Sequence, residues 1–110
     1  DKIEQNITLK GATERYLYLI CQATIDFAEA LLSYLNLRSP STYGEIFDIL
    51  EENEVITRNI TLRMIKMAGF RNILTHSYGK INFDIVYQVL IKDIKNIKNF
   101  IKAVKNVVKI

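Results

Sequence analysis

Residues that break helices are almost absent from this sequence, which has one proline, Pro40, and four glycines among 110 residues. Proline removes a backbone donor and clashes with the preceding turn, and glycine adds backbone flexibility, so both interrupt helices. A chain with so few of them has room for long helices joined by short connections. Its length and its 49% hydrophobic content suit a single core, so we expect one helical domain spanning residues 1–110.

Two long stretches of the sequence repeat apolar residues at alternating steps of three and four. The first stretch runs from about Ala12 to Leu37, and the second begins after Asn82 and continues to Val108. This spacing turns one side of a helix towards a core, so we predict two long helices, the second capped by Asn82. Residues 1–10 are too ambiguous to assign. The apolar positions are Leu17, Cys21, Ala28, Leu31 and Leu35 in the first stretch and Val86, Leu90, Ile94, Ile97, Ile101 and Val104 in the second.

The connection after the first helix leads into a short helix. Pro40 disfavours helical geometry in the residue before it, so the first helix is expected to end ahead of this proline. Thr42 followed by Glu45 matches a capping box, which predicts a helix from Tyr43 to about Glu52. Its inward face is formed by Ile46, Phe47, Ile49 and Leu50.

A third long helix is expected to begin near Thr57 or Arg58 and to run down to a motif of Arg71, His76 and Tyr78. Its apolar residues are Ile60, Met64, Ile65, Ala68 and Ile73. The predicted fold class is therefore all-α: an antiparallel up-and-down helical bundle with three long helices and one short helix.

Several protein classes are disfavoured by what the sequence lacks. The single cysteine, Cys21, excludes an intrachain disulfide, and its apolar surroundings favour a buried structural thiol over a nucleophile. No run of eighteen apolar residues and no signal-peptide pattern is present, so we expect a cytoplasmic protein without a membrane partner. The acidic group at Glu51, Glu52 and Glu54 has no histidine, cysteine or loop glycine beside it, so no metal site is expected.

Two acids interrupt the apolar faces of the first helix. Asp26 and Glu29 are interpreted as an exposed flank or as partners for an arginine such as Arg71, rather than as acid or base catalysts.

The only histidine of the chain, His76, lies five residues after Arg71 and two before Tyr78, and Gly79 follows as a candidate helix stop. Arginine presents a planar fork of donors that suits phosphate, and histidine moves protons near neutral pH. Five residues on an ideal helix separate two side chains by about 140°. Arg71 and His76 could therefore converge only if the last turn loosened, if the arginine side chain wrapped round, or if a second copy of the chain supplied one of them. The alternative is structural: Arg71 pairs with an acid and His76 caps helix carbonyls.

The string Arg71-Asn72-Ile73-Leu74-Thr75-His76-Ser77-Tyr78 fits the R-x-x-x-x-H-x-Y signature of the HEPN superfamily. The flanking Met67-Ala68-Gly69-Phe70 and Tyr78-Gly79 resemble its HepT toxin branch, and the similarity covers nearly the whole chain. Members of this family usually begin with one more helical segment, and this sequence opens on Asp1 without methionine, so we expect that a segment could be missing. The resemblance implies a dimeric, metal-independent endoribonuclease toxin without a cofactor, paired with an MNT-type nucleotidyltransferase antitoxin.

The reaction explains why a dimer is expected. Cleavage of RNA through its 2′-hydroxyl needs a base, an acid and cations for the crowded phosphorane, and it leaves a 2′,3′-cyclic phosphate. One chain has one imidazole, whereas a two-fold dimer supplies two copies of Arg71 and His76 across a shared cleft. We assign proton transfer to His76 and phosphate binding to Arg71. Asn72 either supports the site by orienting a phosphate or has a structural role.

The resemblance also implies that Tyr78 is the residue to which the partner nucleotidyltransferase attaches adenylate. The added bulk and negative charge would obstruct RNA two residues from His76. The alternative is that the tyrosine ring only packs at the rim of the cleft.

A stripe of lysines follows the outer side of the last predicted helix, at Lys95, Lys98, Lys102, Lys105 and Lys109. The net charge of +3 permits nucleic-acid binding. A solvated helix face is the default interpretation of this stripe, with RNA contacts at Lys95, Lys98 and Lys102 or an acidic partner as alternatives.

A non-catalytic function remains as an alternative for the whole chain: a HEPN dimer that docks a nucleotidyltransferase and helps to bind nucleotide or polynucleotide. The presence of both Arg71 and His76 favours the nuclease, because a scaffold has no need of both.

Overall fold

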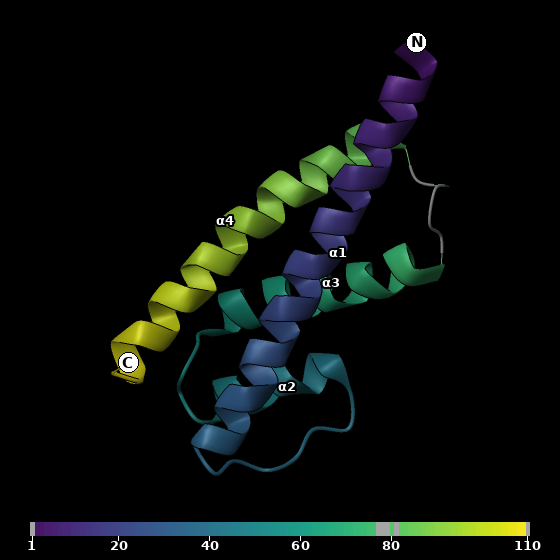
Figure 1. Ribbon diagram of the computed structural model, residues 1–110. Helices are drawn as coiled ribbons and strands as arrows, with labels where there is room; N and C mark the ends of the chain where they lie inside the picture. The colour runs from purple at the N-terminus through teal and green to yellow at the C-terminus, as the bar shows by residue number, and fades with distance from the viewer. Residues whose placement is uncertain (1, 77–79, 81, 110) are drawn as a thin grey trace.

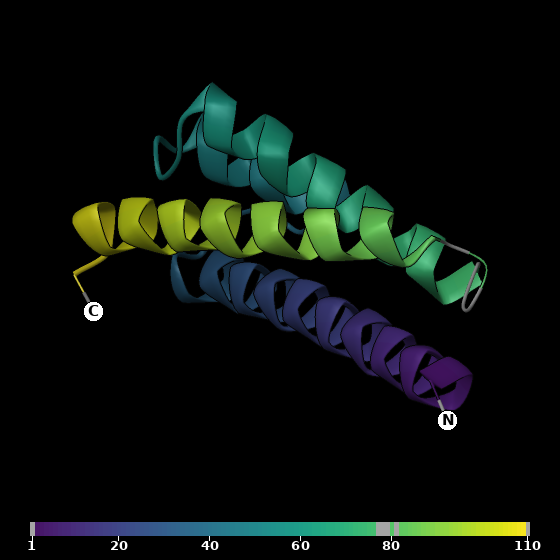
Figure 2. The same ribbon diagram turned by 90° about the horizontal axis from the view of Figure 1, so that it is seen from above.

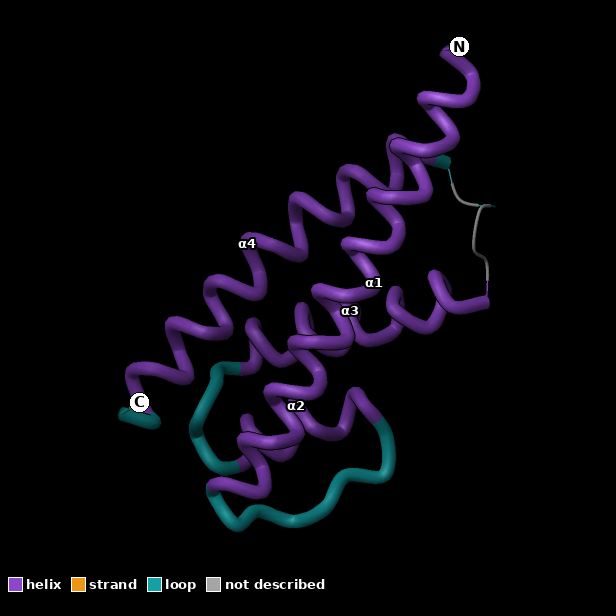
Figure 3. Tube along the Cα trace, in the orientation of Figure 1, coloured by secondary structure: helices purple, strands orange, loops and turns teal. Residues whose placement is uncertain are grey.

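The computed structural model contains four α-helices: α1 (Lys2–Tyr34), α2 (Tyr43–Glu52), α3 (Arg58–His76) and α4 (Phe83–Val107) (Figure 1). The structure describes residues 2–76, 80 and 82–109. Within these residues everything outside the helices is turn or loop, with no strand (Figure 3). Helix α2 has 10 residues and the other three have 33, 19 and 25, as predicted for one short and three long helices.

The three long helices alternate in direction. Helices α1 and α4 run the same way, and α3 returns in the opposite direction, as two perpendicular views show (Figures 1 and 2). Helix α3 contacts all three other helices, and α2 packs against α1 and α3. The molecule is elongated, 52 × 25 × 21 Å. The predicted up-and-down helical bundle is therefore confirmed, and none of its described helices is long and apolar enough to cross a membrane.

The core is centred on two fully buried phenylalanines from α2 and α4. Phe47 and Phe100 meet edge to face with ring centroids 5.6 Å apart, and Phe27 of α1 meets Phe100 in the same way at 6.2 Å. Such contacts join three helices at one point. The predicted inward face of α2 is confirmed because Ile46, Phe47, Ile49 and Leu50 are all buried.

Helix α1 differs from its predicted bounds at both ends. It begins at Lys2 rather than near Ala12, because one glycine in a long helix costs only about 1 kcal/mol. Its C-terminus is set by a Schellman motif. Asn36 has a φ of 57°, its amide donates to the Ser33 carbonyl at 3.1 Å, and the Leu37 amide donates to the Leu32 carbonyl at 2.9 Å. The helix therefore ends at Tyr34, several residues before the proline.

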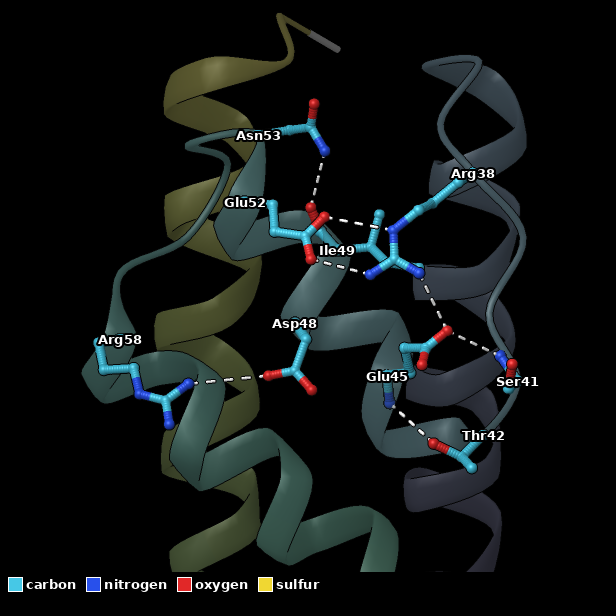
Figure 4. A network of polar contacts seen from close by, with 9 residues as sticks. All are labelled: Arg38, Ser41, Thr42, Glu45, Asp48, Ile49, Glu52, Asn53 and Arg58. Atoms are coloured by element: carbon cyan, nitrogen blue, oxygen red, sulfur yellow. Dashed lines mark hydrogen bonds and ion pairs between the residues drawn. The ribbon is translucent and has the colours of Figure 1, made fainter.

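The loop between α1 and α2 is tied down by Arg38 (Figure 4). Its guanidinium donates to both carboxylate oxygens of Glu52, at 2.8 and 3.3 Å, and to Glu45 at 3.1 Å. The Glu45 carboxylate also accepts from the Ser41 amide, while the Thr42 hydroxyl accepts from the Glu45 amide. The predicted cap at Thr42 is confirmed. Single exposed ion pairs stabilise little. This network, however, fixes the start of α2 and therefore the position of Tyr43, its first residue.

The end of α2 and the start of α4 are held by local contacts. Arg58, at the start of α3, forms ion pairs with Glu51 at 3.2 Å and with Asp48 at 3.7 Å, so it ties the start of α3 to α2. The Asn82 side chain accepts from the Asp84 amide at 2.8 Å and caps α4 as predicted.

Candidate functional site

Arg71 is held between two tyrosines. Its guanidinium carbon lies 5.3 Å from the ring centroid of Tyr18 on α1 and 5.3 Å from that of Tyr43 on α2. Its Nη2 donates to the Tyr18 hydroxyl at 3.3 Å, and its Nε donates to the Gln22 side-chain oxygen at 2.8 Å. Cation–π and hydrogen-bond contacts from two other helices therefore fix the side chain of Arg71.

The remaining contacts of Arg71 are also with neutral groups. Its Nη1 donates to Asn72 Oδ1 at 3.0 Å. The Gln22 amide nitrogen in turn donates to Asp26 at 2.8 Å, so Gln22 stands between the arginine and this acid. Of the two roles considered for Asp26 and Glu29, the exposed flank is confirmed, because both residues are exposed and neither forms an ion pair with Arg71 among the described residues. We call Tyr18, Gln22, Tyr43, Arg71 and Asn72 the Arg71 cluster. Its positive charge is not neutralised by an ion pair with any described carboxylate, so it can attract an anion.

His76 ends α3 and its side chain is exposed. Helix α3 is continuous from Arg71 to His76, so it does not loosen between these two residues. Two side chains five residues apart on such a helix point about 140° away from each other. The Arg71 side chain reaches towards α1 and α2, where its partners lie, so it does not wrap round α3. The imidazole forms no hydrogen bond with another described residue, so the capping role is not seen there.

The other sequence-predicted residues are either not described by the structure or lie on α4. Tyr78 and Gly79 fall outside the described residues. Lys95, Lys98 and Lys102 are exposed on α4, and the partners of Arg71 come from α1, α2 and α3.

Sequence reasoning missed Tyr18, Gln22 and Tyr43. A signal for two of them was present: Tyr18, Gln22 and Asp26 follow one another at steps of four, directly beside the buried line of Leu17, Cys21 and Ile25. A polar line at the border of a core is where a half-buried arginine such as Arg71 finds partners. Tyr43 carried no comparable signal, since it appears only as the first residue of α2.

A pocket of about 330 Å³ adjoins the Arg71 cluster. Its lining combines an acid, hydroxyls, an amide and an aromatic ring: Glu29, Pro40, Ser41, Thr42, Tyr43 and Asn72. We call this cavity the Tyr43 pocket. Two of its residues, Tyr43 and Asn72, also belong to the Arg71 cluster. Its volume lies near the lower end of the range for small-ligand sites, about 300–1,000 Å³.

Cys21 and Asp93 form a separate buried pair between α1 and α4. The thiol donates to the carboxylate with the sulfur 3.6 Å from the oxygen. Burial, reinforced by the Asp93 charge, raises the pKa of the Cys21 thiol well above its usual range. Because thiolate is the reactive form, Cys21 is inert, in agreement with the structural role predicted for it. Among the described residues, no group of three histidine, cysteine or acidic side chains is placed to hold a metal ion.

A comparison with protein families identifies the chain. The model of the family described as "Ribonuclease HepT-like" matches residues 1–104. The chain belongs to the HepT-like family. This result confirms the HEPN and HepT resemblance, and the matched range includes every residue of the Arg71 cluster and of the Tyr43 pocket.

Two individual relatives of this chain are HepT nucleases, in agreement with the family match. The mRNA nuclease HepT of Shewanella oneidensis is 31% identical over 104 residues, which are 94% of the chain and 78% of that protein. The tRNA nuclease HepT of Aphanizomenon flos-aquae is 33% identical over 78 residues, which are 71% of the chain and 53% of that protein.

Solved structures confirm the fold. A toxin–antitoxin complex with AMP-PNP contains a chain that matches with a TM-score of 0.81 and 29% identity. A tri-AMPylated HEPN toxin from Shewanella oneidensis, in complex with an MNT antitoxin, matches with a TM-score of 0.80 and 30% identity. Each match covers 96% of this chain and 80% of the other chain.

Proposed function

We propose that the chain is a metal-independent endoribonuclease toxin of a HEPN/MNT toxin–antitoxin system, with Arg71 and His76 at its catalytic site. The observation that carries this proposal is the set of contacts around Arg71: two tyrosines and two amides hold it in place, and no described acid forms an ion pair with it. A fixed arginine with a free charge is suited to a phosphodiester and to the charge that develops on it. His76 is the one imidazole that can move protons.

The proposed active site is shared by two copies of the chain. Within one copy, Arg71 and His76 point to different sides of α3, and one imidazole cannot easily serve as both base and acid. Two exposed apolar side chains, Leu62 at 51% and Ile73 at 49%, lie within about 60° of His76 around α3. Exposed apolar side chains on one helix face are the kind of surface that a second copy covers. In such a dimer, one His76 takes the proton of the 2′-hydroxyl and the other protonates the departing 5′-oxygen.

The proposed antitoxin is an MNT-type nucleotidyltransferase. It is supported by the two structural matches, which are toxin–antitoxin complexes, one of them with an AMPylated toxin. Tyr78 is the proposed acceptor of adenylate because of its place in the sequence motif. A phosphate ester there would add negative charge close to His76 and oppose RNA binding.

The proposal is tested with purified protein, a single-stranded RNA and the DNA of the same sequence, all in EDTA. The RNA should be cut to fragments ending in 2′,3′-cyclic phosphate, and the DNA should stay intact because it lacks the nucleophile. His76→Ala should abolish cleavage with helicity and RNA affinity preserved, because the change removes a proton-transfer group and leaves the phosphate ligands in place. If His76→Ala cleaves as fast as the parent, His76 is not the proton-transfer residue and the proposed mechanism fails; if the parent itself cuts no RNA, the docking-module alternative replaces the nuclease proposal.

A further inference from the structure

We propose that the Tyr43 pocket is a nucleobase subsite that selects guanine, next to the phosphate bound by Arg71. This inference rests on the proposed function, since it names the base that the same site recognises. The pocket lies between α1, the loop that Arg38 holds, and the N-terminus of α2, with Asn72 of α3 on its remaining side. Three helices and a tethered loop therefore shape it.

The aromatic wall supplies the first element of base recognition. The Tyr43 ring lines the pocket and is 37% exposed, while the guanidinium of Arg71 lies 5.3 Å from its centroid. Unpaired bases are commonly bound by stacking on tyrosine rings. Arg71 fixes this ring from one direction, so the ring is in position before a base arrives.

The carboxylate of Glu29 discriminates between the bases, because it accepts hydrogen bonds from the base edge. A carboxylate beside a polyanion is unfavourable unless it meets donors, and no other described residue pairs with Glu29. A carboxylate accepts two parallel hydrogen bonds. Guanine presents two adjacent donors, N1–H and the N2 amino group, on one edge. Adenine and cytosine each place a ring-nitrogen acceptor beside their amino group, and uracil places two carbonyls around its single N–H, so each of these bases would direct a lone pair at the carboxylate.

The other polar groups of the pocket are left as donors by the contacts they already make. Asn72 accepts from Arg71 through its oxygen, so its amide nitrogen is free to donate. The Thr42 hydroxyl accepts from the Glu45 amide, so its proton is available as well. Donors on this side complement the O6 and N7 acceptors of guanine.

Two shared residues connect the base to the phosphate. Tyr43 and Asn72 both contact Arg71 and both line the pocket. A guanine in the pocket therefore belongs to a nucleotide beside the phosphate at Arg71, and cleavage is expected next to guanosine.

The test compares short RNAs of uridine that carry one guanosine, inosine or adenosine at the same position. The parent protein should prefer guanosine over adenosine by at least about tenfold in kcat/KM, since one bidentate pair gives about this discrimination. Inosine lacks the N2 amino group and should fall between the two. Glu29→Gln should bring the guanosine preference close to one. The matched control is Glu54→Gln, which removes the same charge from an exposed residue outside the pocket and should keep the preference.

A binding measurement separates this proposal from the proposed function. The same RNAs are bound to the His76→Ala variant, and to His76→Ala with Glu29→Gln or Glu54→Gln added. Tighter binding of the guanosine RNA that disappears only with Glu29→Gln supports the subsite, even if the parent cuts no RNA and the nuclease proposal has failed. Equal binding of all three RNAs by the His76→Ala variant, or a guanosine preference that survives Glu29→Gln, overturns it.

Discussion

Arg71 donates its Nε hydrogen bond to the neutral side chain of Gln22, at 2.8 Å, rather than to an acid. Gln22 in turn holds Asp26 at 2.8 Å, so a carboxylate lies close to the arginine without touching it. An amide partner fixes the direction of the guanidinium and leaves its charge for a ligand, whereas a carboxylate would occupy that charge. This contact makes Arg71 a suitable group for binding phosphate in the proposed nuclease.

Replacing Gln22, the neutral partner of Arg71, with an acid should weaken RNA cleavage. Gln22→Glu places a carboxylate on Arg71 Nε, so we expect kcat/KM for RNA to fall by about tenfold or more through weaker phosphate binding. Gln88→Glu adds the same charge at an exposed position of α4 and should cleave like the parent. Normal cleavage by Gln22→Glu would show that the charge of Arg71 is not used.

Lysine should not replace Arg71, although it keeps the positive charge. A lysine cannot bridge Tyr18, Gln22 and Asn72 at once, because it lacks the planar fork. We expect Arg71→Lys to reduce kcat/KM by about a hundredfold while the salt dependence of RNA binding stays near that of the parent. Arg71→Ala should lower the slope of that dependence by about 0.7 for each phosphate group that the variant no longer binds. An active Arg71→Lys enzyme would contradict the assigned role.

The buried Cys21–Asp93 pair predicts a pH effect on stability. Burial raises the pKa of Asp93 above its ordinary value of 3.8, with Cys21 and the charge of Lys66 acting in the opposite direction. A carboxyl with a raised folded-state pKa contributes most to stability below its unfolded-state pKa, and this contribution is lost as pH rises through the raised pKa.

Asp93→Asn keeps an acceptor for the thiol and removes the ionisation. We therefore expect its free energy of unfolding to lack the decline that the parent shows as pH rises from about 4, and to exceed that of the parent at pH 7. Urea unfolding at several pH values measures this difference. A parent whose stability shows the same pH profile as Asp93→Asn would contradict the prediction.

The end of α1 offers a test of the fold that is independent of function. Asn36 has a φ of 57°, which alanine adopts only at a cost of about 1 kcal/mol. Asn36→Ala should lower the urea midpoint, and Asn36→Gly should not. Asn99→Ala, the same change at an exposed position inside α4, should stabilise slightly because alanine favours helix. Equal midpoints for Asn36→Ala and Asn36→Gly would contradict the Schellman motif as the helix stop.

The parts of the fold that the sequence predicted depend on local patterns. The start of α2 follows from Thr42 and Glu45, and the start of α4 from Asn82, because each cap bonds within three residues. The end of α1 was not predicted correctly, because it depends on the backbone angle of Asn36. The prediction relied on the proline and therefore placed the end of the helix too close to it.

In the candidate site too, the residues of the local motif were predicted and the partners from distant parts of the chain were not. The motif picked out Arg71 and His76 from neighbouring positions. The partners of Arg71 could not be predicted from spacing, because Gln22 and Tyr18 lie 49 and 53 residues away in the chain and meet it only after α1 and α3 have packed. Phe100 was missed for a related reason: the repeat assigned to α4 passes through Ile97 and Ile101, and packing against Phe47 turned Phe100 inward.

Two copies of His76 are proposed to act at one site, and dimers that mix parent and variant subunits test this sharing. Parent and His76→Ala subunits are unfolded together in varying ratio, refolded and assayed for RNA cleavage, with dimer formation checked by light scattering. If each site needs both imidazoles, activity falls with the square of the parent fraction and is about one quarter at an equal mixture. A linear decline, with half of the activity at an equal mixture, would contradict the shared site.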